Sequence, residues 1–222
     1  FGLAQFSRLK EHLLRATEQA LGQRYLLDLV VPGGTRNDLA PAGATVLDEY
    51  LAQLTDEVTV LRGIYEEHTG LRDRFAGAGT VLPELAAWIG LVGLAGRASG
   101  QTLDLRVDAA CAPYDELAVR RCTQQDGDVL ARVTLRFDEL AESVRLLRRI
   151  LRAMPSGEHA VAVPVPEPGA VGVGLIEAWR GPVVTGLEAG PDGSILRCHP
   201  QDPSWHNWPA LEHAIIGNIV PD

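Results

Sequence analysis

Cysteine is scarce in this sequence and shows no regular spacing. The 222 residues contain three cysteines, Cys111, Cys122 and Cys198, and none of them forms a Cys-x-x-Cys pair. Three unpatterned cysteines do not make a disulfide framework, which favours a reducing compartment. Soft metals are usually held by paired thiolates. We therefore expect no metal site and no bound cofactor within this chain.

Lysine, aromatic residues and long apolar runs are also rare. Lys10 is the only lysine among 20 basic residues, and arginine suits fixed ion pairs better than lysine does. The net charge of −9 disfavours nonspecific binding to nucleic acid, because such binding depends on neutralising phosphates. No apolar run reaches the roughly 18 residues of a membrane helix, and no signal peptide is evident. We expect no direct membrane span, so that any membrane association is through partners.

Apolar residues at helical spacing are the strongest pattern in the first two thirds of the chain. They predict helices over residues 3–25, 45–68, 83–90 and 126–154, and a last helix over 209–217. In the longest of these, one apolar stripe is expected, made of Val129, Val133, Phe137, Leu140, Val144, Leu147 and Leu151. Residues 1–155 are therefore predicted to form a bundle of long helices.

Short alternating segments rich in glycine and valine follow. Residues 169–176, 183–187 and 194–198 read as strands separated by Gly-Pro turns, after a proline-rich linker over 159–168. The predicted fold class is α+β, mainly α, with a small β region near residues 160–200. Residues 156–222 would pack on the bundle formed by 1–155, so that both ranges make one structural unit.

The stretch Glu-Ala-Trp-Arg-Gly at residues 177–181 puts a carboxylate and a guanidinium near one tight turn. From composition alone, an ordinary salt bridge beside a turn explains it. Other candidate sites are weaker. Cys198-His199, with His206 and His213, offers metal-ligand residue types but lacks the spacing of a zinc site.

Four segments together resemble a known family. The turn at 177–181 is similar to the Glu-Ala-Pro-Arg-Gly segment of NiFe hydrogenase large subunits and of the 49 kDa subunit of respiratory complex I, the NADH-quinone oxidoreductase. Formate-hydrogenlyase-type large subunits belong to the same superfamily. Residues 32–39, 97–108 and 127–155 resemble further family segments in the same order. The resemblance implies a hydrogenase large-subunit-like fold, which hosts both metal-bearing and metal-free proteins.

The resemblance also implies where the metal ligands of relatives would fall. Metal-bearing members hold nickel and iron with two Cys-x-x-Cys pairs, one near each end of their chains. Aligned on the four segments, one pair would precede Phe1 and the other would follow Asp222. We therefore expect the sequence to be a fragment that lacks both terminal Cys-x-x-Cys regions.

Site residues follow from the resemblance as well. In metal-bearing relatives the arginine of the turn lies beside the ligands of iron. Carried over, Arg180 takes that pocket position as a catalytic residue, and Glu177 orients it or relays a proton. Residues of the other segments are expected either to bind substrate or to form structural ion pairs: Asp104, Arg106, Asp108, Arg36 and Asp38.

The sequence departs from the family pattern near this turn. Trp179 stands where the family has proline, Pro182 replaces an acidic residue, and Leu103 replaces an arginine before the matched Asp104. These changes favour a divergent member that no longer performs hydrogen chemistry.

Three functions remain open at this point. The first is an electron-transfer subunit of an NADH:quinone oxidoreductase, inactive in isolation, which forms part of a quinone pocket and docks a small iron–sulfur subunit. The resemblance then implies quinone, iron–sulfur clusters in partners, and a cytoplasmic location at the inner face of the cell membrane. The second is a NiFe hydrogenase or formate-hydrogenlyase large subunit, with nickel and iron. The third is a scaffold without catalysis.

Overall fold

The computed structural model describes residues 2–219, and its contacts divide the chain into two compact units. The first unit comprises Phe1–Tyr65 and Ser143–Pro164, and the second comprises Glu66–Glu142 and Val165–Asp222. Each unit thus combines segments that are far apart in the sequence. One long helix, α7 (Val129–Ala153), contributes its beginning to the second unit and its end to the first.

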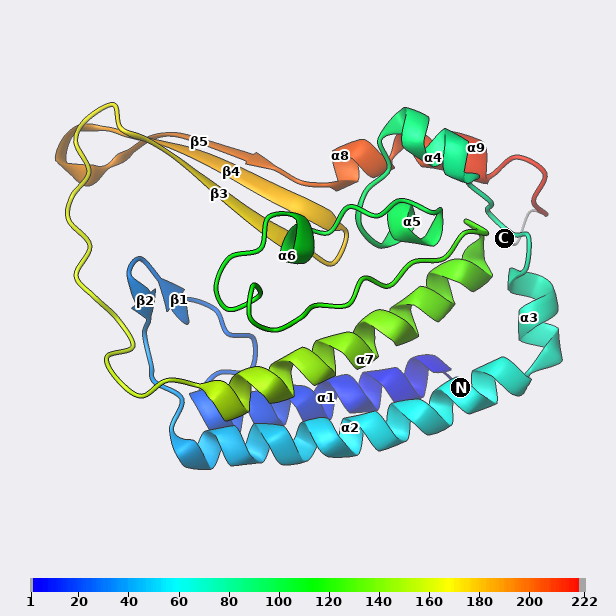
Figure 1. Cartoon of the computed structure of the whole chain (residues 1–222), viewed down its shortest axis with the longest axis horizontal. Coiled ribbons are helices and arrows are strands. Elements are labelled where there is room, and N and C mark those ends of the chain that lie inside the picture. Colours follow the sequence, from blue (N-terminus) through cyan, green and yellow to red (C-terminus); the bar gives the residue numbers. More distant parts are fainter. Residues whose placement is uncertain (1, 220–222) are drawn as a thin grey trace. The chain divides into compact units, whose positions relative to one another are not determined.

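The first unit is built from helices that lie side by side. α1 (Gly2–Leu21), most of α2 (Pro41–Glu67) and the end of α7 run alongside one another in Figure 1. Apolar side chains from all three are buried, among them Leu9, Leu51 and Val144. The two oxygens of Asp48 on α2 accept hydrogen bonds from Arg148 on α7 at 2.7 and 3.0 Å. Helical periodicity predicted these elements because each buries one apolar face.

A small hairpin in the first unit was not expected. β1 (Val30–Val31) pairs antiparallel with β2 (Gly34–Thr35). Gly33 has a φ of +87°, and a Cβ there would lie 2.2 Å from the carbonyl oxygen of Val161. Only glycine fits this position, because the chain turns and the segment near residue 160 passes against it. The signal was present in the sequence, as a Pro-Gly turn between β-branched residues.

The second unit holds short helices, the start of α7 and a sheet. The helices are α3 (Thr69–Phe75), α4 (Pro83–Ile89), α5 (Gly93–Ala98), α6 (Leu105–Asp108), α8 (Ser204–Asn207) and α9 (Pro209–Ala214). Figure 1 shows α4 beside α9, and the two helices are in contact. Their shared core includes Val81, Ala86, Leu91 and Ala210, and a second cluster joins α5 to α7 through Leu94, Ala98, Ala131 and Leu135.

The sheet is a meander of three antiparallel strands. β3 (Val171–Ala178) pairs with β4 (Gly181–Ala189), which pairs with β5 (Ile195–Gln201). A short 3-10 helix, η1 (Pro191–Gly193), connects β4 to β5. Ala178 lies opposite Gly181, so that Trp179 and Arg180 form the two-residue turn between β3 and β4. The register therefore places Arg180 at the tip of a hairpin.

The mainly α fold class and the small β region are confirmed. Some details of the prediction are wrong. The single stripe expected on α7 is not fully buried: Leu147 is exposed, while Leu135 and Leu146 are buried instead. The reason is that the two ends of α7 pack in different units, so no single face of the helix is buried along its whole length.

The last helix is shorter than expected, and it follows a separate turn, α8. The contact units do not follow a boundary at residue 155, and the assignment of domains from the sequence stays a prediction. None of the helices within residues 2–219 is long and apolar enough to cross a membrane.

Candidate active-site cavity

A cavity of about 400 Å³ lies in the second unit beside the hairpin tip. Its wall is mostly apolar, with two guanidinium groups and few other polar side chains. The lining residues are Val81, Leu91, Ala95, Arg132, Arg180, Ser204, Asn207, Trp208, Ala210, Leu211 and Ala214. A concave apolar site with a few convergent polar groups is the usual form of a small-molecule site.

Arg180 reaches this cavity from the turn between β3 and β4. Its guanidinium lies 6.0 Å from the centre of the Trp179 ring, and Arg136 lies 5.3 Å from the same ring. Among the described residues, no carboxylate forms an ion pair with Arg180. The carboxylate whose charge interacts with it is Asp202, whose pKa is lowered by hydrogen bonds from Ser204 and also by the charge of Arg180. The charge of Arg180 is therefore available to a ligand.

Arg132 enters the same cavity from α7. Its two terminal nitrogens donate to the carbonyl oxygens of Gly127 at 2.7 Å and Gly79 at 3.0 Å. Burial lowers the pKa of Arg132, the nearby Asp128 opposes this shift, and Arg136 adds to it. No carboxylate in the described part of the chain forms an ion pair with Arg132. The cavity thus carries two guanidinium groups that no ion pair neutralises.

Glu177 does not pair with Arg180, which corrects the expectation from the sequence. One Glu177 oxygen accepts a hydrogen bond from Arg97 at 2.8 Å, and the other accepts from the Leu105 N–H at 3.2 Å. Glu177 lies on β3, which contacts α6, whereas Arg180 lies beyond the end of the strand. The carboxylate therefore faces the helices, away from the turn, and does not line the cavity.

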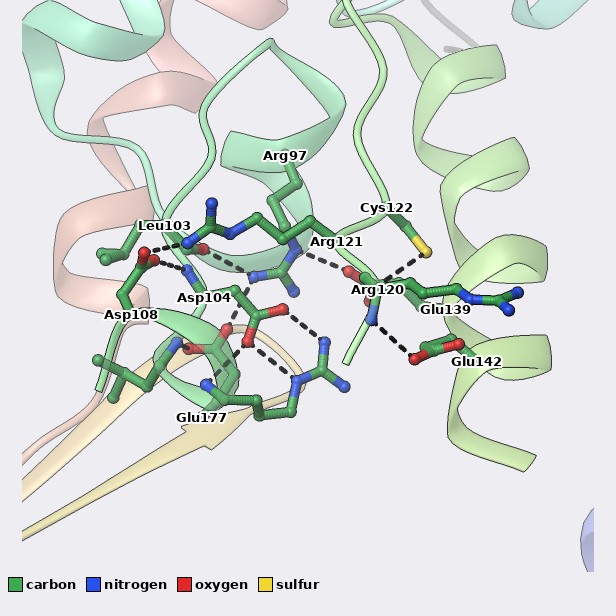
Figure 2. A network of polar contacts seen from close by, with 12 residues as sticks. Arg97, Leu103, Asp104, Asp108, Arg120, Arg121, Cys122, Glu139, Glu142 and Glu177 are labelled. Atoms are coloured by element: carbon green, nitrogen blue, oxygen red, sulfur yellow. Dashed lines mark hydrogen bonds and ion pairs between the residues drawn. The ribbon is translucent and has the colours of Figure 1, made fainter. Parts of the chain in front are cut away.

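Arg97 is the centre of a buried ionic network, shown in Figure 2. Its side chain is only 2% exposed, and it bonds Glu139 at 2.7 Å as well as Glu177, whose side chain is 3% exposed. A third hydrogen bond runs from Arg97 to the Leu103 carbonyl oxygen at 3.0 Å. Burial alone would lower the pKa of Arg97, but Glu177 and Glu139 outweigh it and raise that pKa. The network joins α5, α7 and β3.

Asp104 and Arg106 extend this network as an ion pair. Arg106 donates to both oxygens of Asp104, at 2.9 and 2.7 Å, and Asp104 is fully buried. Burial opposes ionisation of Asp104, but its hydrogen bonds from Arg106 and the charge of Arg97 lower its pKa overall. Asp108 accepts from the Asp104 N–H at 2.9 Å and pairs with Arg121.

The other predicted site residues are not part of this group. Arg36 and Asp38 belong to the first unit, where both are exposed after β2. Arg97, Glu139 and Asn207 were assigned no site role from the sequence. The first two stand in the segments that carry the family resemblance.

No group of three or more His, Cys, Asp or Glu side chains that could hold a metal ion occurs within the described residues. The candidate metal ligands from the sequence were Cys198, His199, His206 and His213. Of these, His206 contacts Gln201 instead, with 2.8 Å between the Nε2 atoms of the two side chains.

Cys122 lies beside this network (Figure 2), and we expect its burial and the nearby carboxylates to slow the reaction of its thiol with alkylating reagents. Burial, together with Asp138, Glu139 and Glu142, raises the pKa of the Cys122 thiol to about 11. Since the thiolate is the reactive form, iodoacetamide should label Cys122 about 100-fold more slowly at pH 8 than an ordinary exposed thiol. Its rate should rise about tenfold per pH unit up to pH 10.

Mass spectrometry of each labelled peptide measures these rates, with the exposed Cys111 and Cys198 as internal references. Labelling of Cys122 as fast as the two references at pH 8 would contradict the prediction.

Comparison with known proteins agrees with the fold and the motifs. The family model for the 49 kDa subunit of respiratory-chain NADH dehydrogenase matches residues 3–172. The carbon monoxide-induced hydrogenase of Rhodospirillum rubrum is 29% identical over 217 residues, which cover 96% of this chain and 59% of the relative. Formate hydrogenlyase subunit 5 of Escherichia coli K12 is 28% identical, over 100% of this chain and 39% of the relative.

Two further proteins are similar to this chain, one in sequence and one in structure. One subunit of the NADH-quinone oxidoreductase of Salinibacter ruber is 26% identical, over 96% of this chain and 53% of the relative. A chain of the membrane-bound sulfane sulfur reductase, an archaeal respiratory membrane complex, superposes with a TM-score of 0.88 at 24% identity, over 97% of this chain and 61% of that one. The chain thus spans about 40–60% of the length of these relatives. With its family model matched over most of its residues, the chain belongs to the family of the 49 kDa subunit of respiratory-chain NADH dehydrogenase.

Proposed function

We propose that this chain is part of an electron-transfer subunit of a membrane-bound NADH:quinone oxidoreductase, and that the cavity beside Arg180 receives the quinone head. The family match and a relative that is a subunit of an NADH-quinone oxidoreductase support the class of complex. The observation that carries the site is the guanidinium of Arg180, which lies in the wall of an apolar cavity and forms no ion pair among the described residues.

The chemistry of a quinone fits this wall. A quinone is a flat apolar ring with carbonyl oxygens that accept hydrogen bonds, and these oxygens gain negative charge as electrons arrive. A preorganised guanidinium in a largely apolar site stabilises such developing charge strongly. Arg132 offers a second donor from α7. Two cationic groups would favour the reduced, more negative ligand over the neutral one.

The remaining roles follow from this proposal. Electrons would come from the clusters of a small iron–sulfur subunit that docks on this one, with no cofactor held by the chain itself. The complex would place the protein at the inner, cytoplasmic face of the cell membrane through other subunits. The hairpin that carries Arg180 would be held in place by Glu177, Asp104, Arg106 and Asp108. Arg36 and Asp38 would act in the first unit, outside this cavity.

A second candidate is a nickel–iron hydrogenase large subunit, favoured by two relatives that are named as hydrogenase and hydrogenlyase proteins. A scaffold role is the third. Metal analysis of the full-length protein with its partners separates them. Nickel at about one per complex would contradict the quinone proposal, and a complex without nickel that reduces no quinone would support the scaffold. Iron does not separate them, because the clusters of the partner subunit contain it.

The direct test replaces Arg180 by alanine in the assembled complex. Quinone-dependent turnover should fall by about 100-fold or more, because one preorganised donor to the reacting oxygen is lost. Arg180→Lys should recover only part of the loss, since lysine lacks the planar fork of donors.

Arg197→Ala is the matched control. Arg197 lies on β5 of the same sheet, is largely exposed, and does not line the cavity. Its replacement should leave turnover within about twofold of the wild type, as expected for an exposed ion pair. Unchanged turnover in Arg180→Ala would show that the site assignment is wrong.

A further inference from the structure

We propose that Asn207 is a positioning residue, which holds the turn that carries Arg180 against the start of α5. The side-chain amide of Asn207 donates from Nδ2 to the Arg180 carbonyl oxygen at 3.1 Å. Its Oδ1 accepts from the Val92 N–H, also at 3.1 Å. One side chain thus joins the hairpin tip to the residue that precedes α5.

The two main chains that Asn207 joins lie in direct contact. Gly93, the first residue of α5, has a φ of +62°, and a Cβ there would lie 2.0 Å from the Arg180 carbonyl oxygen. On the other side, a Cβ on Gly181 would lie 2.9 Å from Cγ2 of Val92. Both glycines are buried. The hairpin tip therefore cannot move closer to the start of α5.

Asparagine suits this position for a chemical reason. The Arg180 carbonyl needs a donor, and the Val92 N–H, which precedes the first turn of a helix, needs an acceptor. An amide of this length supplies both at once. Aspartate keeps the acceptor but loses the donor, and leucine keeps the approximate size but loses both.

The two hydrogen bonds of Asn207 hold the main chain of the turn beside the cavity. Asn207 lines the cavity together with Arg180. With its carbonyl held by Asn207 and its neighbour Gly181 packed on Val92, the main chain of Arg180 is fixed, and only the side chain can move. The consequence for ligand binding rests on the proposed function, whereas the position of the turn does not.

The first experiment measures the turn itself, in the 222-residue chain. Trp179 shares the turn with Arg180, so its indole N–H signal in a ¹⁵N–¹H NMR spectrum reports the position of the turn; Trp179→Phe assigns the signal. Asn207→Leu and Asn207→Asp should both shift it. The signal of Trp88, on α4, should stay in place, and the dispersion of the backbone amide signals shows that the chain is folded.

Aspartate retains the acceptor for Val92, which keeps the test usable if the leucine variant does not fold. A Trp179 signal that keeps its wild-type position in a folded Asn207→Asp or Asn207→Leu variant would overturn the positioning role.

The second experiment uses the assembled complex and a short-chain quinone. Asn207→Leu should raise KM for the quinone on the order of tenfold, because a displaced guanidinium binds the head poorly and leucine adds no charge to the cavity that residue 207 lines. A variant that was merely less stable would lower the amount of active complex and leave KM unchanged. A shifted Trp179 signal with an unchanged KM would leave the positioning role intact and overturn the proposed quinone site.

Discussion

Replacing Glu177 by alanine should lower the free energy of unfolding by about 3–5 kcal/mol, because the charge of Arg97 stays buried without one of its two carboxylates. Arg97 cannot reach water, since its side chain is 2% exposed, and it cannot lose its proton at physiological pH. The Leu105 N–H loses its acceptor in the same variant. Glu177→Gln should be milder, because the amide oxygen can still accept one of these hydrogen bonds.

A triple variant separates burial of charge from packing. Arg97→Met with Glu177→Leu and Glu139→Leu removes the guanidinium together with both of its carboxylates and keeps apolar volume, so it should be less destabilising than Glu177→Ala alone. Urea unfolding, followed by circular dichroism, measures all three variants.

Glu188→Ala is the control for the alanine variant. Glu188 lies on β4 of the same sheet and pairs at 3.5 Å with the exposed Arg197. Its removal should change stability by less than about 1 kcal/mol. If Glu177→Ala were no more destabilising than Glu188→Ala, Arg97 would not depend on Glu177.

Gly93→Ala should be the second most disruptive single change, at about 2–5 kcal/mol. The new Cβ would lie 2.0 Å from the Arg180 carbonyl oxygen, which is main chain and cannot swing aside. Overpacking of this kind destabilises by about 1–3 kcal/mol, and the left-handed conformation at Gly93 adds about 1–2 kcal/mol for any residue with a Cβ. The hairpin tip must also move away from α5, so the Trp179 indole signal should shift.

Gly90→Ala isolates the conformational part of this effect. Gly90 has a similar φ of +68°, but nothing lies within 4 Å of its Cβ position. We expect a loss of only about 1–2 kcal/mol and an unshifted Trp179 signal. Equal losses in the two variants would mean that the contact between Gly93 and the turn does not constrain the hairpin.

The predictable part of the fold is the part with local periodicity. The spacing of apolar residues predicted α1, α2 and α7 because each buries a face, and short alternating segments separated by Gly-Pro turns predicted the sheet. The face that α7 buries was predicted only in part, since the helix packs in two units and each unit uses different residues. The apolar pattern of a single helix does not show which unit each of its ends packs in.

The candidate site was predictable to a similar extent. The family segments directed attention to Arg180, which does line a cavity. The partner of Glu177 was not predictable from its neighbours, because Arg97 lies 80 residues earlier in the chain. Asn207 was assigned no site role from the sequence, because its bond to Val92 spans 115 residues.

The sequence by itself determined the family, the mainly α fold class, the scarcity of thiolates and the turn that presents Arg180. These depend on composition and on patterns within a few residues. Only the tertiary structure decided that Glu177 neutralises Arg97, that Arg132 shares the cavity with Arg180, and that Asn207 clamps the turn. The physical reason is that a buried charge or main-chain polar group must find a partner in space, and that partner is supplied by whichever distant segment the packing brings into contact.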